Sequence, residues 1–469
     1  MRDVVVMLPG ITGSVLQKDG KDVWNVSGGS ALRALFTLGG AVKELALERD
    51  QPEVDDLGDG VSATEVMRDI HLIPGLWKID GYSKCFRHVT DTFDVERGKN
   101  FFEFAYDWRR DNRVAARRLA QESRRWLAEW RRDAGAPDAK LVLVGHSMGG
   151  LVARYFLECL DGWRDTRVLV TFGTPYRGSV NAVATLVNGL RKGIGPVGVD
   201  LSSLARSFTS IYQLLPIYPC YDGGDGKLVR IAEVAVPNVE REKAEAALEF
   251  HREIERAVEG HRDDEEYRER GYAIRPVVGT FQPTSQSARL TGNRVELLRT
   301  YDGRDLDGDG TVPRVSATPI EVKDEENAMF AAERHASLQN DDPVLVQLTG
   351  ILSGIDIDHD RFREALPQIG LALDLDDVYG PEEPVAVRVR PQQPPSQPLV
   401  VEVENVETSE RTARATLRLG DDGWHAGELG PLAEGTYRLT AFGPGPVEPV
   451  TDLFAVIADD GGGPVREPT

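Results

Sequence analysis

The feature that most constrains the fold of this chain is the segment from Leu141 to Arg154, LVLVGHSMGGLVAR. Four apolar residues open the segment and predict a buried parallel strand. Gly145 to Gly149 then follow the G-x-S-x-G pattern, and further apolar residues continue at helical spacing. A serine on so sharp a turn between strand and helix has a strained backbone and an exposed hydroxyl. The segment therefore predicts a strand–turn–helix unit that presents Ser147 as a nucleophile.

Strand candidates recur along the first part of the chain, and helical stretches separate several of them. The predicted strands are Val4–Leu8, Phe101–Ala105, Leu141–Val144, Val168–Phe172 and Arg275–Thr280, and the predicted helices include Asn112–Arg132 and Leu151–Leu160. This alternation is typical of a mostly parallel sheet covered by helices on both faces. Together with the serine turn, it predicts the α/β class and an α/β-hydrolase fold.

The remaining segments predict the domain organisation. Ala182–Tyr221 is apolar with scattered glycines, and Glu240–Arg270 is predicted to be one highly charged, solvated helix. Together they indicate a helical cap, inserted over about 182–270 in a hydrolase domain of residues 1–376. Prolines then predict a stiff linker over 377–398. Short alternating segments predict an immunoglobulin-like β-sandwich over 399–460 without catalytic motifs, followed by a disordered tail over 461–469.

A serine nucleophile needs a base and an acid, which in α/β hydrolases follow it in the order acid, then histidine. For the acid, we predict Asp309 in an acidic, glycine-rich segment, with Asp307 and Asp305 as alternatives. The same aspartates resemble the start of a calcium-binding loop. That loop needs a glutamate at its twelfth position, where this chain has Ser316, and flanking helices are missing. We therefore expect neither a metal ion nor a cofactor.

Eight histidines are candidates for the base, and chain order removes most of them. Two lie before Ser147, and His146 adjoins it, where its side chain must point away from the hydroxyl. Two more lie in the predicted charged helix and one lies in the predicted sandwich. Of the remaining pair, His335 follows Thr318–Val322, the predicted last strand. His359 lies among three aspartates after the domain has closed, so the topology favours His335.

An oxyanion hole needs two preorganised N–H donors. The residue after the nucleophile, Met148, supplies one of them. The other is expected from a glycine-bearing turn after an early strand, and Pro9–Ser14, PGITGS, directly follows the first strand. The amide of Ile11 is the best placed in that turn.

These motifs together resemble the lecithin:cholesterol acyltransferase family, which includes lysosomal phospholipases and phospholipid:diacylglycerol acyltransferases. Between about Arg2 and Gly350, in the family's order, the matching pieces are LPGITGSVL, YDWRRD, VGHSMGGLVARYFL, FGTPYRGS, SFTSIYQLLP, DGDGTVP and RHASL. The resemblance implies the same site residues as the topology: Ser147, Asp309 and His335, with oxyanion donors at Ile11 and Met148. It also implies a structural Asp107–Arg109 pair.

The resemblance implies acyl transfer from a lipid ester. An acyl chain of a glycerophospholipid would move to Ser147 and then to water or an alcohol. Apolar residues of the cap would line the acyl-chain pocket, with simple core packing as the alternative. The set includes Leu186, Phe208, Tyr212 and Leu215, with Leu190, Ile211 and Leu214 nearby. An alternative function of a different class is a non-catalytic scaffold that binds a partner on a hydrolase fold.

Composition restricts the partners. The formal net charge of −21 disfavours nucleic acid and strongly anionic membranes as main partners. The three cysteines are too few and too scattered for a disulfide framework, unlike in secreted family members. A predicted strand starts within the first residues in place of a leader peptide, and no apolar run reaches the roughly 18 residues of a membrane span. We therefore expect a cytoplasmic protein.

The expected substrate is a lipid or acyl ester, and a soluble chain without an anchor favours short, soluble or monomeric esters. Two further hypotheses concern partners. Trp24 and the apolar run Ala31–Leu38 would make transient contact with a lipid surface. The sandwich would bind a protein partner.

Overall fold

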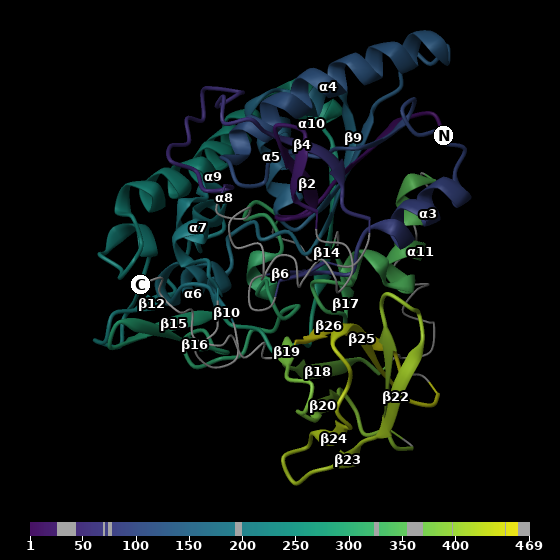
Figure 1. Ribbon diagram of the computed structural model, residues 1–469. Helices are drawn as coiled ribbons and strands as arrows, with labels where there is room; N and C mark the ends of the chain where they lie inside the picture. The colour runs from purple at the N-terminus through teal and green to yellow at the C-terminus, as the bar shows by residue number, and fades with distance from the viewer. Residues whose placement is uncertain are drawn as a thin grey trace, which may run out of the picture.

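A parallel sheet forms the centre of the molecule (Figure 1). The computed structural model describes residues 1–25, 44–68, 71–73, 77–192, 199–322, 328–353, 369–395, 397–445 and 447–457. Six parallel strands run in the order β17-β14-β9-β8-β1-β7. Their bounds are β1 Val4–Leu8, β7 Phe101–Glu103, β8 Leu141–His146, β9 Thr166–Phe172, β14 Ala273–Gly279 and β17 Met329–Ala331. All five predicted strands are present.

Helices cover both faces of this sheet. Val4, Val6 and Leu8 pack in one core with residues of α4 (Asn112–Asp133) and α5 (Met148–Cys159). Val5 and Met7 pack in a second core with residues of α3 (Ser83–Thr92) and α11 (Asp342–Leu352). Alternate side chains of β1 thus enter opposite cores, as expected for a parallel strand buried on both faces. The predicted α/β class is confirmed.

The predicted last strand, Thr318–Val322, is wrong, because the chain makes a turn there and the edge strand is β17, closer to His335. Pro319 has no N–H group to donate to a strand, and the Ile320 side chain is 56% exposed. A short alternating sequence cannot by itself distinguish such a turn from a strand.

Helices and small sheets surround the central sheet. The helices are α6 (Val180–Asn188), α7 (Ser202–Ser207), α8 (Thr209–Gln213), α9 (Arg241–His261) and α10 (Glu265–Arg270), with short 3-10 turns at Gly162–Asp165, Ile231–Glu233, Arg314–Ser316 and Leu338–Asn340. The added strands are β2 (Ser14–Lys18), β3 (Lys21–Trp24), β4 (Val61–Val66), β5 (His71–Ile73), β6 (Trp77–Ile79), β10 (Arg191–Lys192), β11 (Val199–Asp200), β12 (Tyr221–Asp222), β13 (Leu228–Val229), β15 (Ser287–Thr291) and β16 (Arg294–Leu298).

The single charged helix predicted over Glu240–Arg270 is two helices. The Asp264 side chain accepts hydrogen bonds from two backbone N–H groups of the next turn and so starts α10 as a new helix. One side of α9 is also buried, including Phe250 and His251, so this helix is amphipathic rather than fully solvated.

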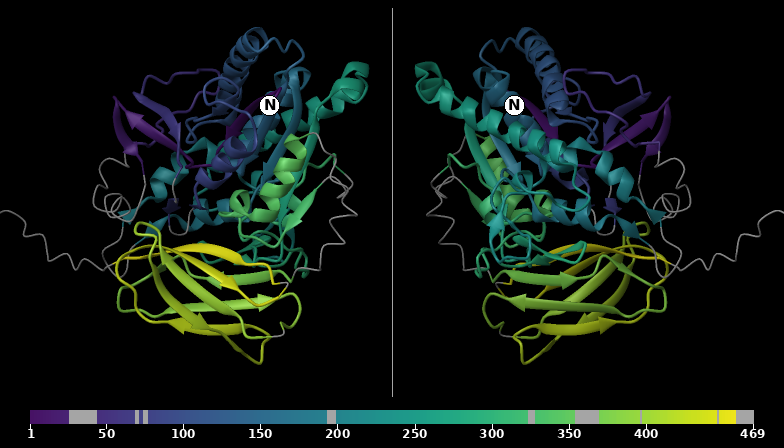
Figure 2. Two further views of the ribbon diagram at one scale, coloured as in Figure 1. Left: turned by 90° about the vertical axis from the view of Figure 1, so that its right-hand side faces the viewer. Right: turned by 90° about the vertical axis from the view of Figure 1, so that its left-hand side faces the viewer.

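Two β-sheets form the C-terminal part, which we call the sandwich (Leu371–Val456). One sheet has the order β18-β20-β24-β23, the other β19-β26-β25-β21-β22, and their apolar side chains share one core. The strands are β18 (Leu371–Leu375), β19 (Val378–Tyr379), β20 (Val385–Pro391), β21 (Val400–Asn405), β22 (Arg411–Thr416), β23 (Arg418–Leu419), β24 (His425–Leu429), β25 (Gly435–Phe442) and β26 (Val450–Val456). Figure 2 shows the sandwich as a separate layer against the part that contains the central parallel sheet, which we call the hydrolase part after its predicted fold.

The predicted linker over 377–398 and the domain end at 376 are wrong, because β18 and β20 are paired strands of the sandwich. Val385, Val387 and Val389 alternate with exposed residues and enter its core. This two-residue period outweighs the prolines around it.

Several expectations fall outside the part of the chain that the structure describes, namely those on Ala31–Leu38, His359 and the tail 461–469. Across the described ranges, no helix combines the length and the apolar character that crossing a bilayer requires.

Candidate active site

Ser147 lies on the turn between β8 and α5, with backbone angles φ 52° and ψ −124°. A positive φ is strained for any residue with a Cβ, so surrounding contacts must hold it. The Ser147 N–H donates to the Phe172 carbonyl (2.9 Å), and the Thr174 hydroxyl donates to the Ser147 carbonyl (2.9 Å). Gly149 lets the turn approach the first strand, since a Cβ there would lie 2.5 Å from the Pro9 carbonyl oxygen.

The structure brings Ser147, His335 and Asp309 into one chain of hydrogen bonds. The distance from His335 Nε2 to Ser147 Oγ is 3.1 Å, and that from His335 Nδ1 to Asp309 Oδ2 is 2.7 Å. All three residues are buried. A carboxylate at Nδ1 favours the tautomer with its proton on that nitrogen, which leaves Nε2 free to accept the serine proton. The arrangement suits nucleophilic catalysis.

Backbone groups orient the carboxylate of Asp309. Its Oδ1 accepts hydrogen bonds from the N–H groups of Thr311 (2.9 Å) and Val312 (2.7 Å), while Oδ2 faces the imidazole. The His335 N–H also donates to the Asp309 carbonyl oxygen at 2.8 Å, so the acid and histidine loops are joined by main chain as well.

The side chains of the alternative acids, Asp305 and Asp307, accept hydrogen bonds that stabilise the loop. Asp305 Oδ1 accepts from Gln286 Nε2 (2.6 Å) and the Asp307 N–H (2.9 Å). Asp307 Oδ1 accepts from the N–H groups of Gly308 and Phe281. Among the described residues, no three histidine, cysteine, aspartate or glutamate side chains gather as metal ligands.

A glycine makes room for the acid–histidine contact. Gly173, after β9, has φ +55°, and a Cβ there would lie 2.8 Å from both Asp309 Oδ2 and His335 Nδ1. Gly173 of the FGTPYRGS motif thus leaves space for the contact between Asp309 and His335, a role that the sequence did not reveal.

The two predicted oxyanion donors belong to the helix that begins after the serine and to the turn after β1. Met148 is the first residue of α5, where N–H groups lack partners within the helix. Ile11 is buried in the turn after β1. That turn reaches the nucleophile, because a Cβ on Gly10 would lie 3.0 Å from Ser147 Cβ.

His146, which the sequence predicts only to point away from the serine, connects the site's loops. Its Nε2 lies 3.1 Å from the His335 carbonyl oxygen, so it donates there, and its Nδ1 lies 2.9 Å from the Tyr82 hydroxyl. That hydroxyl also accepts the Gly10 N–H at 2.8 Å. Burial lowers the pKa of His146 to about 3, which keeps it neutral and suits these roles. No motif in the sequence indicates this contact.

The Asp107–Arg109 pair implied by the resemblance is present. Arg109 is fully buried, and its Nε and Nη2 lie 2.9 and 2.6 Å from the two carboxylate oxygens of Asp107. Its Nη2 also donates to Asp59 at 2.9 Å. Although burial acts in the opposite direction, hydrogen bonds and the charges of these carboxylates raise the pKa of Arg109. The pair therefore links the loop that contains Asp59, near the N-terminus, to the core.

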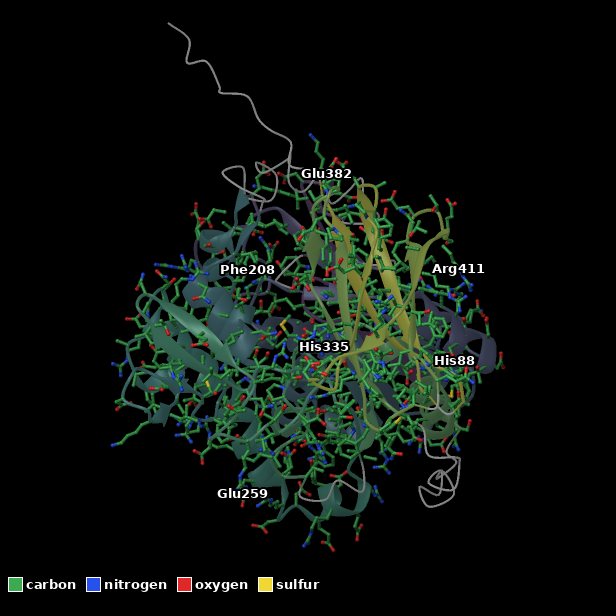
Figure 3. The ribbon with its side chains drawn as sticks, turned by 90° about the horizontal axis from the view of Figure 1, so that it is seen from below. His88, Phe208, Glu259, His335, Glu382 and Arg411 are labelled. Carbon is green, nitrogen blue, oxygen red and sulfur yellow. The ribbon has the colours of Figure 1, made fainter. Side chains whose placement is uncertain are left out.

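The predicted acyl-chain residues lie in the core. Leu186, Phe208, Tyr212 and Leu215 all belong to the larger hydrophobic cluster and are at most 5% exposed. The Phe208 ring packs edge-on against Trp108, with centroids 5.5 Å apart. None of the four lines the cavity that borders Asp309 and His335, although Leu190 of the same predicted set does, and Phe208 lies away from His335 in Figure 3. The geometry supports the packing alternative for these four.

A cavity of about 400 Å³ borders the acid and the histidine. Its walls include Asp309 and His335, several residues of α6, and four charged side chains: Lys78, Arg334, Asp377 and Asp452. The last two belong to the sandwich, which therefore forms one wall. The sequence does not indicate this wall, because nothing in the strand pattern shows which surface of the sandwich faces the site.

Residues 42–258 match the model of the family described as lecithin:cholesterol acyltransferase. The matched range contains the serine turn and the first part of the insertion after β9. The resemblance drawn from the motifs is confirmed. A search of the curated proteins found no match to the chain.

Solved structures with some similarity include a lipase of Bacillus licheniformis, BlEst2. Its mature form is 12% identical, with a TM-score of 0.29, covering 74% of this chain and 91% of that chain. Its propeptide form is 12% identical, with a TM-score of 0.30, covering 98% and 95%. An engineered protein is 14% identical, with a TM-score of 0.19, covering 73% and 60%. These scores are low, so the fold rests on the chain's own strand order.

Proposed function

We propose that the protein is a serine enzyme of phospholipase type. Residues 42–258 match the lecithin:cholesterol acyltransferase family model, so the protein is a lipid ester hydrolase or acyltransferase. In this proposal it cleaves an acyl ester of a glycerophospholipid or related lipid through an acyl-enzyme on Ser147. The observation that carries the proposal is the hydrogen-bonded series from Ser147 Oγ to His335 to Asp309.

The proposed reaction begins when Ser147 Oγ attacks the ester carbonyl while His335 Nε2 takes the hydroxyl proton. Asp309 holds the imidazole and stabilises its positive charge. The N–H groups of Ile11 and Met148 stabilise the negative oxygen of the tetrahedral intermediate. His335 then protonates the departing alcohol, and the acyl group stays on the serine.

In the second half, water or an alcohol attacks the acyl-enzyme, with His335 again as base. Water gives hydrolysis, and an alcohol gives O-acyl transfer. Besides Asp309, the walls of the cavity beside His335 carry two cationic and two anionic side chains. Such walls favour a polar part of a substrate or acceptor over an acyl chain.

A non-catalytic scaffold remains the alternative class. It has no need of a strained serine, a histidine and a carboxylate held in hydrogen-bond contact, since the strain at Ser147 costs of order 1–3 kcal/mol. The intact arrangement therefore favours the enzyme.

The test measures fatty-acid release from a dispersed glycerophospholipid, with and without an added long-chain alcohol. Wild type should release fatty acid, and any transferase activity should appear as a new ester that depends on the alcohol. Ser147→Ala should abolish both products. Ser123→Ala removes a buried hydroxyl on α4, away from the site, and should keep them. Equal activity in wild type and Ser147→Ala would overturn the proposal.

A further inference from the structure

The sandwich touches the two loops that carry Asp309 and His335. On the acid side, the contact runs through Gln282, a buried residue on the segment after β14. Its side-chain Nε2 donates to the Leu371 carbonyl of β18 (2.8 Å), and its Oε1 accepts from the Leu373 N–H (3.1 Å). The amide side chain of Gln282 thus both donates a hydrogen bond to the main chain of β18 and accepts one from it.

The main chain of Gln282 faces the acid. Gln282 and Asp309 form a parallel bridge, and the Gln282 N–H donates to the Gly308 carbonyl at 2.9 Å. The sandwich is therefore linked, through one residue, to the segment whose side chain orients His335. The link contains no charged group and is closed to water.

On the histidine side, the contact runs through Arg334, the residue before His335. Its Nε lies 3.0 Å from Asp452 Oδ2, and its Nη1 donates to the Leu373 carbonyl at 2.6 Å. The Asp452 side chain, on β26, is 1% exposed, and it also pairs with Lys78 at 3.0 Å. Because a buried carboxylate is costly without partners, Asp452 must keep these cations close.

The preceding residue adds a third contact. Glu333 Oε1 accepts from the sandwich's Thr451 N–H at 3.3 Å and from the Arg334 N–H at 2.6 Å. Contacts from two strands of the sandwich therefore converge on the residues just before the histidine.

We propose, on the basis of the function proposed above, that the sandwich helps to position Asp309 and His335 in the active site. Asp452 and Gln282 act as positioning residues: Asp452 fixes the His335 loop through Arg334, and Gln282 fixes the Asp309 loop through β18. Neither touches the reacting atoms. A displacement of about 1 Å in a catalytic group can cost about a hundredfold in rate, so the loss of either contact should lower kcat.

The test compares full-length Asp452→Asn and Gln282→Met with wild type. Each variant should lower kcat about 10- to 100-fold, because the base loses its alignment. Gln282→Met should also keep KM within about threefold, since Gln282 does not line the cavity beside His335, whereas Asp452 does. The rate of inactivation by a small fluorophosphonate should fall by a similar factor, independently of lipid binding. Asp452→Asn combined with Arg334→Gln should lose less than the product of the single effects, because the two residues act through one contact.

Two controls separate positioning from general stability. Asp422→Asn makes the same chemical change on the sandwich surface, where Asp422 pairs with Arg388. Arg438→Gln removes the ion pair between Arg438 and Asp80, another contact between sandwich and hydrolase part. Both controls should keep the wild-type kcat even if they lower the unfolding temperature.

Unchanged kcat in folded Asp452→Asn and Gln282→Met would overturn the inference, as would an equal loss in Arg438→Gln. If Asp452→Asn does not fold, Gln282→Met, which changes no charge, decides in the same assay. A wild type without hydrolysis or labelling would instead contradict the proposed function, so the two failures are distinguishable.

Discussion

The imidazole of His146 holds the main chain of His335, with 3.1 Å between His146 Nε2 and the His335 carbonyl oxygen. The two residues are far apart in sequence, and the second of them is the proposed base. Since His146 precedes Ser147, this contact fixes the base relative to the nucleophile independently of their own side chains. Through Tyr82 the same network reaches Gly10 and the predicted oxyanion turn.

Tyr82→Phe tests this network. The change leaves the Gly10 N–H and His146 Nδ1 without their shared partner, which should lower the free energy of unfolding by about 1–3 kcal/mol. It should also reduce kcat about tenfold, because the oxyanion turn loses an anchor. Tyr437→Phe removes a comparable hydrogen bond within the sandwich, to the Ala433 carbonyl, and should affect stability alone. Denaturant unfolding and ester hydrolysis measure the two effects, and equal kcat losses would contradict the role of Tyr82.

The choice of acid is tested by changing Asp309 and Asp305 to asparagine. Asp309→Asn should lower kcat about 10⁴-fold, because the neutral amide no longer stabilises the required tautomer and charge of His335. Asp305→Asn should change kcat only severalfold, since Asp305 binds Gln286 and the Asp307 N–H. Steady-state hydrolysis of a soluble ester compares them. A larger loss in Asp305→Asn would show that the acid is misassigned.

Gly173→Ala tests the space between acid and base. A Cβ 2.8 Å from both Asp309 Oδ2 and His335 Nδ1 must push the two groups apart, so kcat should fall at least about a hundredfold. Gly135→Ala is the matched control, because Gly135 has a similar φ of +62° with no atom within 4 Å of the added Cβ. Both variants should lose about 1 kcal/mol of stability from backbone strain, and Gly135→Ala should keep full activity.

Two buried histidines predict a pH-dependent stability. Burial lowers the pKa of His146 to about 3 and that of His251 to about 4. Between about pH 6.5 and pH 4 the unfolded chain binds protons at these sites that the folded chain does not. Each histidine should therefore contribute a decrease in the free energy of unfolding as the pH is lowered across this window, of up to about 1.4 kcal/mol per pH unit. Buried carboxyl groups whose pKa is raised, such as Asp341, contribute with the opposite sign.

His251→Gln should reduce this slope, because glutamine does not titrate and its amide can still donate to the Gln213 carbonyl that His251 Nε2 contacts at 2.8 Å. Denaturant unfolding at several pH values measures the slope. An unchanged slope in the variant would contradict the assignment to His251.

Local patterns in the sequence were sufficient for five of the six strands of the central sheet and for choosing Ser147, Asp309 and His335, which the structure brings together. Their types, spacing and order follow from chemistry that every such site needs. The wrong predictions, of a strand at Thr318–Val322 and of a linker over 377–398, have a different origin. A short alternating segment does not reveal whether it finds a strand partner: Thr318–Val322 makes a turn, whereas β20 pairs with both β18 and β24.

Burial was hardest to predict. His251 lies in a charged helix, yet its side chain packs inside and contacts Gln213. Leu186, Phe208, Tyr212 and Leu215, predicted to bind an acyl chain or else to pack in the core, pack in the core, whereas Leu190 of the same set lines the cavity. Composition alone cannot separate an apolar pocket from an apolar core. The contacts of Gln282 and Asp452 were equally invisible, since they join segments about 90 or more residues apart.

The most direct test of the account is the site of covalent labelling by a fluorophosphonate, identified by mass spectrometry of the intact chain and its peptides. The account predicts one adduct per chain, on the peptide that contains Ser147, and none in Ser147→Ala. A folded wild type that stays unlabelled, or equal labelling of Ser147→Ala, would contradict it.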